Sequence, residues 1–230
     1  MTGAGPIVVA KVGGSLLDWP ELPGRLGRFV ASRRDRGDRL VLIVGGGRAA
    51  DWVRELDRIH AIGEAKSHAL AIRSLDLTAR VLAALVPGLA VAETIAEIAP
   101  LRLSGLVPIL APRVVLDEDD RASPDPLPHV WDVTTDSIAA RLAVRLGARR
   151  LVLLKSARAS PGTTRDQAAR LGLVDPAFPV ASRALSEVVA INLRDENLDD
   201  GVVLTVASPD STITVPADHD DFEHVNALSP

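Results

Sequence analysis

The sequence contains no cysteine. Disulfide bonds and thiolate metal sites are therefore excluded, which favours a cytoplasmic protein. The first residues lack the basic and then apolar regions of a signal peptide, so we expect none. No apolar run has the length of a membrane span. A net charge of −4, with acids and bases interspersed, gives no reason to expect a nucleic-acid partner.

Lysine is scarce: Lys11, Lys66 and Lys155 are the three lysines among 26 basic side chains. A compositional bias toward arginine explains the overall ratio. It does not explain why Lys11 follows the apolar run IVVA and Lys155 follows LVLL. A compact ammonium on a flexible stem suits a phosphoryl group in transit, whereas arginine suits fixed bidentate recognition. We therefore interpret Lys11 and Lys155 as functional.

Apolar periodicity predicts the fold class. Runs rich in valine, isoleucine and leucine predict strands at residues 7–12, 40–44, 89–92, 107–110, 151–154 and 202–206. Helical patterns occupy residues 22–34, 49–60, 64–85, 137–146 and 181–193. Near-continuous apolar strands that alternate with helices indicate a parallel sheet covered on both faces. The prediction is an α/β fold, a three-layer αβα sandwich with a mainly parallel central sheet.

The remaining segments are predicted to be loops or a hairpin. Residues 117–128 are acidic and contain three prolines, which predicts a surface loop or lid. Residues 156–178 are irregular, and residues 201–217 resemble a hairpin with a Pro-Asp turn. The acidic clusters at 117–120 and 219–224 are interpreted as solvated acid runs rather than metal ligands.

Two glycine-rich turns, AKVGGSLL at 10–17 and VGGGRAA at 44–50, each end a β-branched run before a helix. Such turns expose backbone N–H groups beside the positive end of a helix dipole, so they predict two anion cradles. The carboxyl ends of parallel strands share one edge, so we expect both turns to converge there with Lys11 and Lys155. Asp136, at a predicted helix start, either orients the two ammonium groups or caps the helix, and the two roles can coexist.

A dinucleotide fingerprint is the rival interpretation of the second turn. Gly45, Gly47 and Ala50 fit the spacing G-x-G-x-x-A. That fingerprint also requires an acid closing the next strand, whereas the following residues have helical periodicity. The P-loop pattern GxxxxGK[ST] is absent from the sequence. A phosphoryl-transfer enzyme therefore ranks above a nicotinamide enzyme.

The order AKVGGSL, VGGG and VTTDSIAARLA, with an apolar strand behind it, resembles the amino acid kinase superfamily over most of the chain. TTDSIAA followed by LVLLKSA is similar to uridylate kinases. GGGRAADWVRELD followed by SHALAIRSLD is more similar to the archaeal-type [5-(aminomethyl)furan-3-yl]methyl phosphate kinases of methanofuran synthesis and one-carbon metabolism. The resemblance implies one kinase-like domain over residues 1–230. Its acceptor-side half is about 1–130, and its nucleotide-side half is about 131–230.

The resemblance also implies roles for individual residues. The ATP phosphates would lie against Lys11, Gly13, Gly14, Ser15, Thr134, Thr135, Asp136, Lys155 and Ser156. The catalytic residues among them would be Lys11, Asp136 and Lys155. The acceptor side would contain Gly45, Gly46, Gly47, Arg54, His68 and Asp76. As alternatives, Arg54 and Asp76 are ordinary solvated helix charges, and His68 is a hydrogen-bonded packing residue.

Cofactor and partner expectations follow from the same resemblance. They are ATP and Mg2+, a small-molecule acceptor bearing a phosphate or carboxylate, and a homo-oligomer. Mg2+ that bridges ATP phosphates needs few protein carboxylates, so no dedicated metal site is expected. No strong general base stands near the glycine turns, which favours an acceptor that is already ionised over an alcohol.

The leading hypothesis is an ATP-dependent kinase that converts a small phosphate ester, such as an aminomethylfuran phosphate, into a diphosphate. A kinase for another small acid or nucleotide, similar to uridylate or acetylglutamate kinases, is an alternative. A second alternative is a non-catalytic nucleotide- or oxyanion-binding protein of the same fold. It stays open because KSARASPG stands at 155–162, where the superfamily commonly has an Asp-Gly turn.

Overall fold

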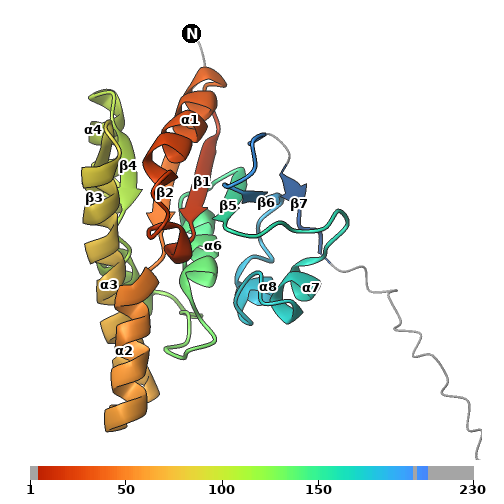
Figure 1. Ribbon diagram of the computed structural model, residues 1–230. Coiled ribbons are helices and arrows are strands. Elements are labelled where there is room, and N and C mark those ends of the chain that lie inside the picture. Colours follow the sequence, from red (N-terminus) through yellow and green to blue (C-terminus); the bar gives the residue numbers. More distant parts are fainter. Residues whose placement is uncertain (1–4, 199–200, 207–230) are drawn as a thin grey trace, which may run out of the picture.

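The computed structural model describes residues 5–198 and 201–206, which form a seven-stranded sheet flanked by helices (Figure 1). The strands are β1 (Ile7–Val12), β2 (Arg39–Val44), β3 (Leu89–Ala92), β4 (Val107–Leu110), β5 (Arg150–Lys155), β6 (Val188–Asn192) and β7 (Val202–Val203). The helices are α1 (Leu22–Asp35), α2 (Gly47–His60), α3 (Glu64–Leu85), α4 (Ile98–Leu103), α5 (Arg113–Ala122), α6 (Thr135–Arg145), α7 (Arg165–Arg170) and α8 (Phe178–Ala181). Two short 3-10 turns are η1 (Gly14–Leu16) and η2 (Ile95–Glu97).

The sheet order is β3-β4-β2-β1-β5-β6-β7, and every pairing is parallel except that of β6 with β7. Strand β1 is central. Lys11 near its end pairs in register with Ile43 of β2 and with Leu153 of β5. The carboxyl ends of these three strands therefore meet at one edge of the sheet. This confirms the predicted mainly parallel sheet.

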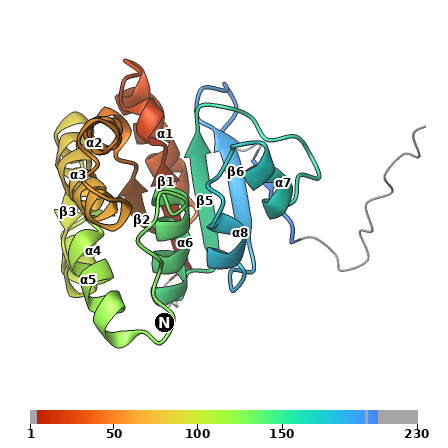
Figure 2. The ribbon, with the colours of Figure 1, turned by 90° about the horizontal axis from the view of Figure 1, so that it is seen from below.

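Alternating residues of β1 belong to two separate cores. Val9 packs in a cluster with residues of α6 and α8, including Ile138 and Phe178. Val8 packs in a cluster with residues of α1, including Phe29. Because side chains of a strand alternate between faces, both faces of the sheet are covered by helices. Figure 2 shows α1 and α6 on opposite sides of β1, which completes the three predicted layers.

One predicted helix is wrong. Residues 181–193 were expected to be helical, but α8 ends at Ala181 and residues 188–192 form β6 between β5 and β7. The sequence VVAIN of β6 is almost fully buried and β-branched, which suits a central strand. Apolar spacing over a short run does not separate a buried strand from a buried helix. This explains the error.

Two loop predictions also need correction. Helix α5 extends to Ala122, so much of the acidic segment 117–128 is helical. Within it Asp119 is buried and pairs with Arg141 at 2.8 Å and Arg145 at 3.2 Å, so it is not a solvated acid. The irregular segment 156–178 contains α7, which begins with a capping box formed by Thr164 and Gln167.

The predicted C-terminal features are only partly described. The hairpin beyond residue 206 and the acidic cluster at 219–224 lie outside the described residues. Among the helices of residues 5–198, none combines the length and apolar character needed to cross a bilayer.

Candidate active site

Two lysines and one aspartate form an ion-paired cluster at the carboxyl edge of the sheet. Lys11 stands near the end of β1, Lys155 ends β5, and Asp136 lies in the first turn of α6. The Nζ of Lys11 is 2.9 Å from Oδ1 of Asp136, and the Nζ of Lys155 is 2.6 Å from Oδ2. One carboxylate therefore holds two ammonium groups from neighbouring strands.

This cluster is largely removed from water. Lys11 and Asp136 are each 5% exposed, and the side chain of Lys155 is 12% exposed. Burial alone would raise the pKa of Asp136, but the charges of Lys11 and Lys155 outweigh it and hold that pKa below its ordinary value. Burial, followed by the charge of Lys11, lowers the pKa of Lys155 to about 8, although Asp136 opposes the shift. At neutral pH the cluster is a buried positive centre.

The two glycine turns touch through their backbones. A Cβ added to Gly14 would lie 2.5 Å from the backbone nitrogen of Gly47. A Cβ added to Gly45 would lie 2.6 Å from the backbone nitrogen of Gly14. Gly47 also has a φ of +53°, in the left-handed region that favours glycine. Only glycine allows so close an approach, and it brings the turns after β1 and β2 together.

Some amides of these turns are already engaged. The N–H of Gly13 donates to the carbonyl of Leu154 at 2.8 Å, and the N–H of Gly45 donates to that of Val12 at 2.9 Å. Both bonds extend the strand ladders. The first turn of α2, beginning at Gly47, leaves its leading N–H groups without intrahelical acceptors. The amides available to an anion therefore lie on the helix side of each turn.

Asp175, which has no role in the sequence analysis, fastens the start of α6. Its Oδ2 accepts hydrogen bonds from the N–H and the hydroxyl of Thr134 at 3.1 and 2.8 Å, and from the N–H of Ser137 at 3.0 Å. The hydroxyl of Ser137 donates to its Oδ1. The alternative of Asp136 as a plain N-cap is therefore wrong, because Thr134 is the N-cap and Asp175 supplies the acceptors.

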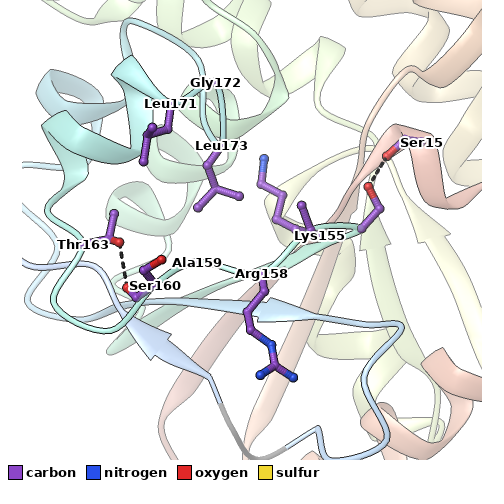
Figure 3. A pocket seen from close by; sticks show the side chains of 11 residues that line it. Ser15, Lys155, Arg158, Ala159, Ser160, Thr163, Leu171, Gly172 and Leu173 are labelled. Carbon is purple, nitrogen blue, oxygen red and sulfur yellow. Dashed lines mark hydrogen bonds between the residues drawn. The ribbon is translucent and has the colours of Figure 1, made fainter.

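A cavity of about 320 Å3 adjoins Lys155, between the end of β5 and the segment around α7. Figure 3 shows the side chain of Lys155 between Leu173 and Ser15. The hydroxyl oxygens of Ser15 and Ser156 are 3.1 Å apart. This pair joins the first glycine turn to the loop after β5. Arg158, in the segment that follows β5, also lines the cavity and pairs with Asp195 at 2.8 Å.

Arg54 and His68, two of the predicted acceptor residues, lie together. The guanidinium carbon of Arg54 is 5.0 Å from the centre of the Trp131 ring. The ring of His68 is buried, and its Nε2 donates to the carbonyl of Val133 at 2.9 Å. Arg54, His68 and Trp131 border one small cavity beside the start of α6. The bond and the burial agree with His68 as a hydrogen-bonded packing residue, and its role at the acceptor stays a prediction.

Asp76 is separate from that cavity. Its Oδ2 lies 3.0 Å from Nε of Arg113, the first residue of α5. Asp76 is thus not a solvated helix charge. Arg113 comes three residues after the end of β4, so it is a basic side chain at a strand end, as Lys11 and Lys155 are. That position was the signal that the sequence analysis missed.

The structure therefore brings the predicted phosphate-side residues together. Lys11, Asp136 and Lys155 touch, and the turns at 13–15 and 45–47 meet beside them. The predicted acceptor residues fall into three groups: the glycine turn at 45–47, Arg54 and His68 around Trp131, and Asp76 at the end of β4. A buried positive centre beside glycine turns and a helix N-terminus attracts oxyanions. The roles of the single residues stay predictions.

The amino acid kinase family model matches residues 6–158, so the chain belongs to the amino acid kinase family. A curated relative is the [5-(aminomethyl)furan-3-yl]methyl phosphate kinase of Methanocaldococcus jannaschii, 28% identical over 146 residues. The match covers 63% of this chain and 63% of that protein, so it spans less than two thirds of the relative.

Solved structures show the same fold at low identity. Uridylate kinase from Archaeoglobus fulgidus has a TM-score of 0.54 and 18% identity, over 86% of this chain and 91% of its own. UMP kinase from Bacillus anthracis has a TM-score of 0.58 and 14% identity, over 84% and 90%. Aspartate kinase from Synechocystis has a TM-score of 0.61 and 14% identity, over 90% and 40%.

Proposed function

We propose that this chain is an ATP-dependent small-molecule kinase that phosphorylates a phosphate-bearing acceptor. The observation that carries the proposal is the buried pair of ammonium groups, Lys11 and Lys155, held by Asp136 beside the two joined glycine turns. Phosphoryl transfer asks a protein mainly for positioning and for stabilisation of negative charge. The family and the kinase names of its relatives agree with this chemistry.

The proposed division of roles follows the two sides of the cluster. The cavity at Lys155, Ser15 and Ser156 takes the nucleotide, and the turn at 45–47 faces the acceptor. Mg2+ bound with ATP would neutralise phosphate charge. In the part of the chain that the structure describes, no group of three or more histidine, cysteine, aspartate or glutamate side chains is arranged to hold a metal ion. The phosphates and water would therefore supply most of its ligands.

The electrostatics favour an acceptor that is already ionised. Asp136, the carboxylate nearest the lysines, has a lowered pKa and is committed to two ion pairs, so it is a poor general base. A phosphate monoester needs no such base, because its oxygen attacks the γ-phosphorus directly and ADP leaves. The aminomethylfuran phosphate named for the 28% identical relative is such an ester. We take it as the first acceptor to test.

Formation of a homo-oligomer stays part of this proposal. The exposed face of α3 carries Leu70, Leu77 and Val81, which offer an apolar surface for a second subunit. Light scattering of the purified protein measures its mass directly.

The test of catalysis is ADP release that depends on the acceptor. Purified protein is incubated with ATP, Mg2+ and [5-(aminomethyl)furan-3-yl]methyl phosphate, and 31P NMR follows the diphosphate product. Lys11→Ala removes one preorganised cation, so kcat should fall by about two to three orders of magnitude. Lys66→Ala is the matched control, because Lys66 is exposed on α3. ATP binding without turnover, across a panel of phosphate and carboxylate acceptors, would instead support the non-catalytic alternative.

A further inference from the structure

His68 carries a buried nitrogen that no described residue satisfies. The residue is 5% exposed, and its Nε2 bonds to the carbonyl oxygen of Val133 at 2.9 Å. A carbonyl only accepts hydrogen bonds, so we assign the ring hydrogen to Nε2, which leaves Nδ1 with a lone pair. Nδ1 is buried and has no hydrogen-bond partner within residues 5–198 and 201–206. A buried nitrogen that accepts no hydrogen bond costs free energy, so we expect a bound molecule to supply the donor.

The ring is held in its neutral form. Burial is the largest influence and lowers the pKa of His68 below its ordinary value, and nearby His129 and Arg54 lower it further. The bond to Val133 and the charge of Glu64 oppose that shift. Nδ1 therefore stays a hydrogen-bond acceptor at neutral pH, and a suitable partner must bring an N–H or an O–H group.

A small cavity borders His68. Its volume is about 30 Å3, close to the share of one water molecule in the liquid, so it admits the tip of a ligand rather than a whole ligand. Trp131 and Thr135 also line it. Thr135 precedes Asp136, which places the cavity near the lysine cluster.

The same cavity also borders the first turns of α2 and α6, because Ala50 and Thr135 line it. Ala50 and Leu75 line it, and both also face Gly46, where an added Cβ would lie 2.6 Å from Cβ of Ala50 and 3.5 Å from Cδ1 of Leu75. The cavity therefore lies between the helix that follows the second glycine turn and the helix that carries Asp136.

We propose that Nδ1 of His68 accepts a hydrogen bond from a donor group at the end of the acceptor away from its phosphate. The inference rests on the proposed kinase function and names the acceptor class: a phosphate monoester with a terminal ammonium or hydroxyl group. Charged groups near the ring include Arg54 with its partner Asp51, Glu64, His129 with its partner Asp120, and Asp57, which bonds to the indole of Trp131. Carboxylates outnumber guanidinium groups among them, which suits a cationic donor.

Two substitutions separate the two ring nitrogens. In His68→Gln the longer amide places its N–H near the position of Nε2, which keeps the bond to Val133 and removes the Nδ1 acceptor. In His68→Asn the amide oxygen takes the place of Nδ1, and the bond to Val133 is lost. His60→Gln is the matched control, because His60 is exposed at the end of α2.

The probes are [5-(aminomethyl)furan-3-yl]methyl phosphate, its 5-hydroxymethyl analogue and its 5-methyl analogue, which has no donor. Calorimetry with a non-hydrolysable ATP analogue present measures each Kd. Wild type, His60→Gln and His68→Asn should bind at least one donor-bearing phosphate about tenfold or more tightly than the methyl analogue. In His68→Gln that preference should shrink to about twofold or less. The Kd values of the aminomethyl and hydroxymethyl phosphates show which donor group the cavity prefers.

Equal affinity of wild type for all three phosphates, lack of binding of all three, or an unchanged preference in His68→Gln would overturn the inference. Turnover of the same probes is measured in parallel. Phosphorylation of the methyl analogue at the rate of the others would reject the role of His68 and leave the kinase proposal standing. The kinase proposal itself fails only when no phosphate or carboxylate acceptor is phosphorylated.

Discussion

Lys155 should make catalysis sensitive to alkaline pH. Burial and the charge of Lys11 lower its pKa to about 8 in the free protein, so its ammonium loses a proton within an accessible pH range. The protonated fraction is about nine tenths at pH 7 and about one tenth at pH 9. If only the protonated form binds the ATP phosphates productively, kcat/KM for ATP should be about tenfold lower at pH 9 than at pH 7.

The pH dependence of kcat, measured at saturating nucleotide, provides a second test. Bound phosphates place negative charge beside Lys155 and raise its pKa, so kcat should fall less than kcat/KM over the same range. Lys155→Arg keeps its charge at pH 9, because a guanidinium does not lose its proton there. This variant should be slower, because arginine lacks the compact geometry of lysine, but its kcat/KM should be flat up to pH 9.

The small number of lysines permits a direct measurement. The only lysines of the chain are Lys11, Lys66 and Lys155, so 13Cε-lysine labelling gives three NMR signals. One signal should titrate near pH 8 and should vanish in Lys155→Arg. A kcat/KM that stays constant to pH 9, or an alkaline fall that persists unchanged in Lys155→Arg, would refute the reasoning.

Two further substitutions test how the site is held in place. Asp175→Ala leaves the donors of Thr134 and Ser137 without their acceptor, so stability should fall by about 3 kcal/mol and Tm by roughly 6–12 °C, measured by calorimetry. An unchanged Tm would contradict the anchoring role. Gly14→Ala forces the two turns apart and should lower both Tm and kcat/KM. Gly27→Ala, whose added Cβ meets nothing within 4 Å, should do neither, and equal behaviour of the two variants would reject the close-contact argument.

The sequence predicted every strand of the described sheet except β6. Lys11 and the first glycine turn follow a clear apolar run, and parallel topology alone then requires the ends of β1, β2 and β5 to meet. Strand β6 was missed because its apolar residues continue a run with helical spacing. Local sequence carries little information about which neighbours will pair around such a strand.

The long-range supports of the site had no local signature. Asp175 bonds to residues about forty positions earlier, and only the folded chain shows that it fastens α6. Asp76 and Arg113 are likewise distant in sequence, and no local pattern indicates that they form an ion pair. The free nitrogen of His68 depends on which carbonyl its other nitrogen meets, which the sequence does not state.

Because β1 lies at the centre of the sheet, truncated fragments of this chain should fold poorly. One edge of β1 pairs with β2 nearby in sequence, whereas the other pairs with β5, more than one hundred residues later. A fragment ending before residue 150 would expose a long apolar strand edge, which invites aggregation. During synthesis β1 has no partner on its second edge until β5 has been made. We therefore expect the centre of the sheet to form slowly and late in folding, and only when both halves of the chain are present.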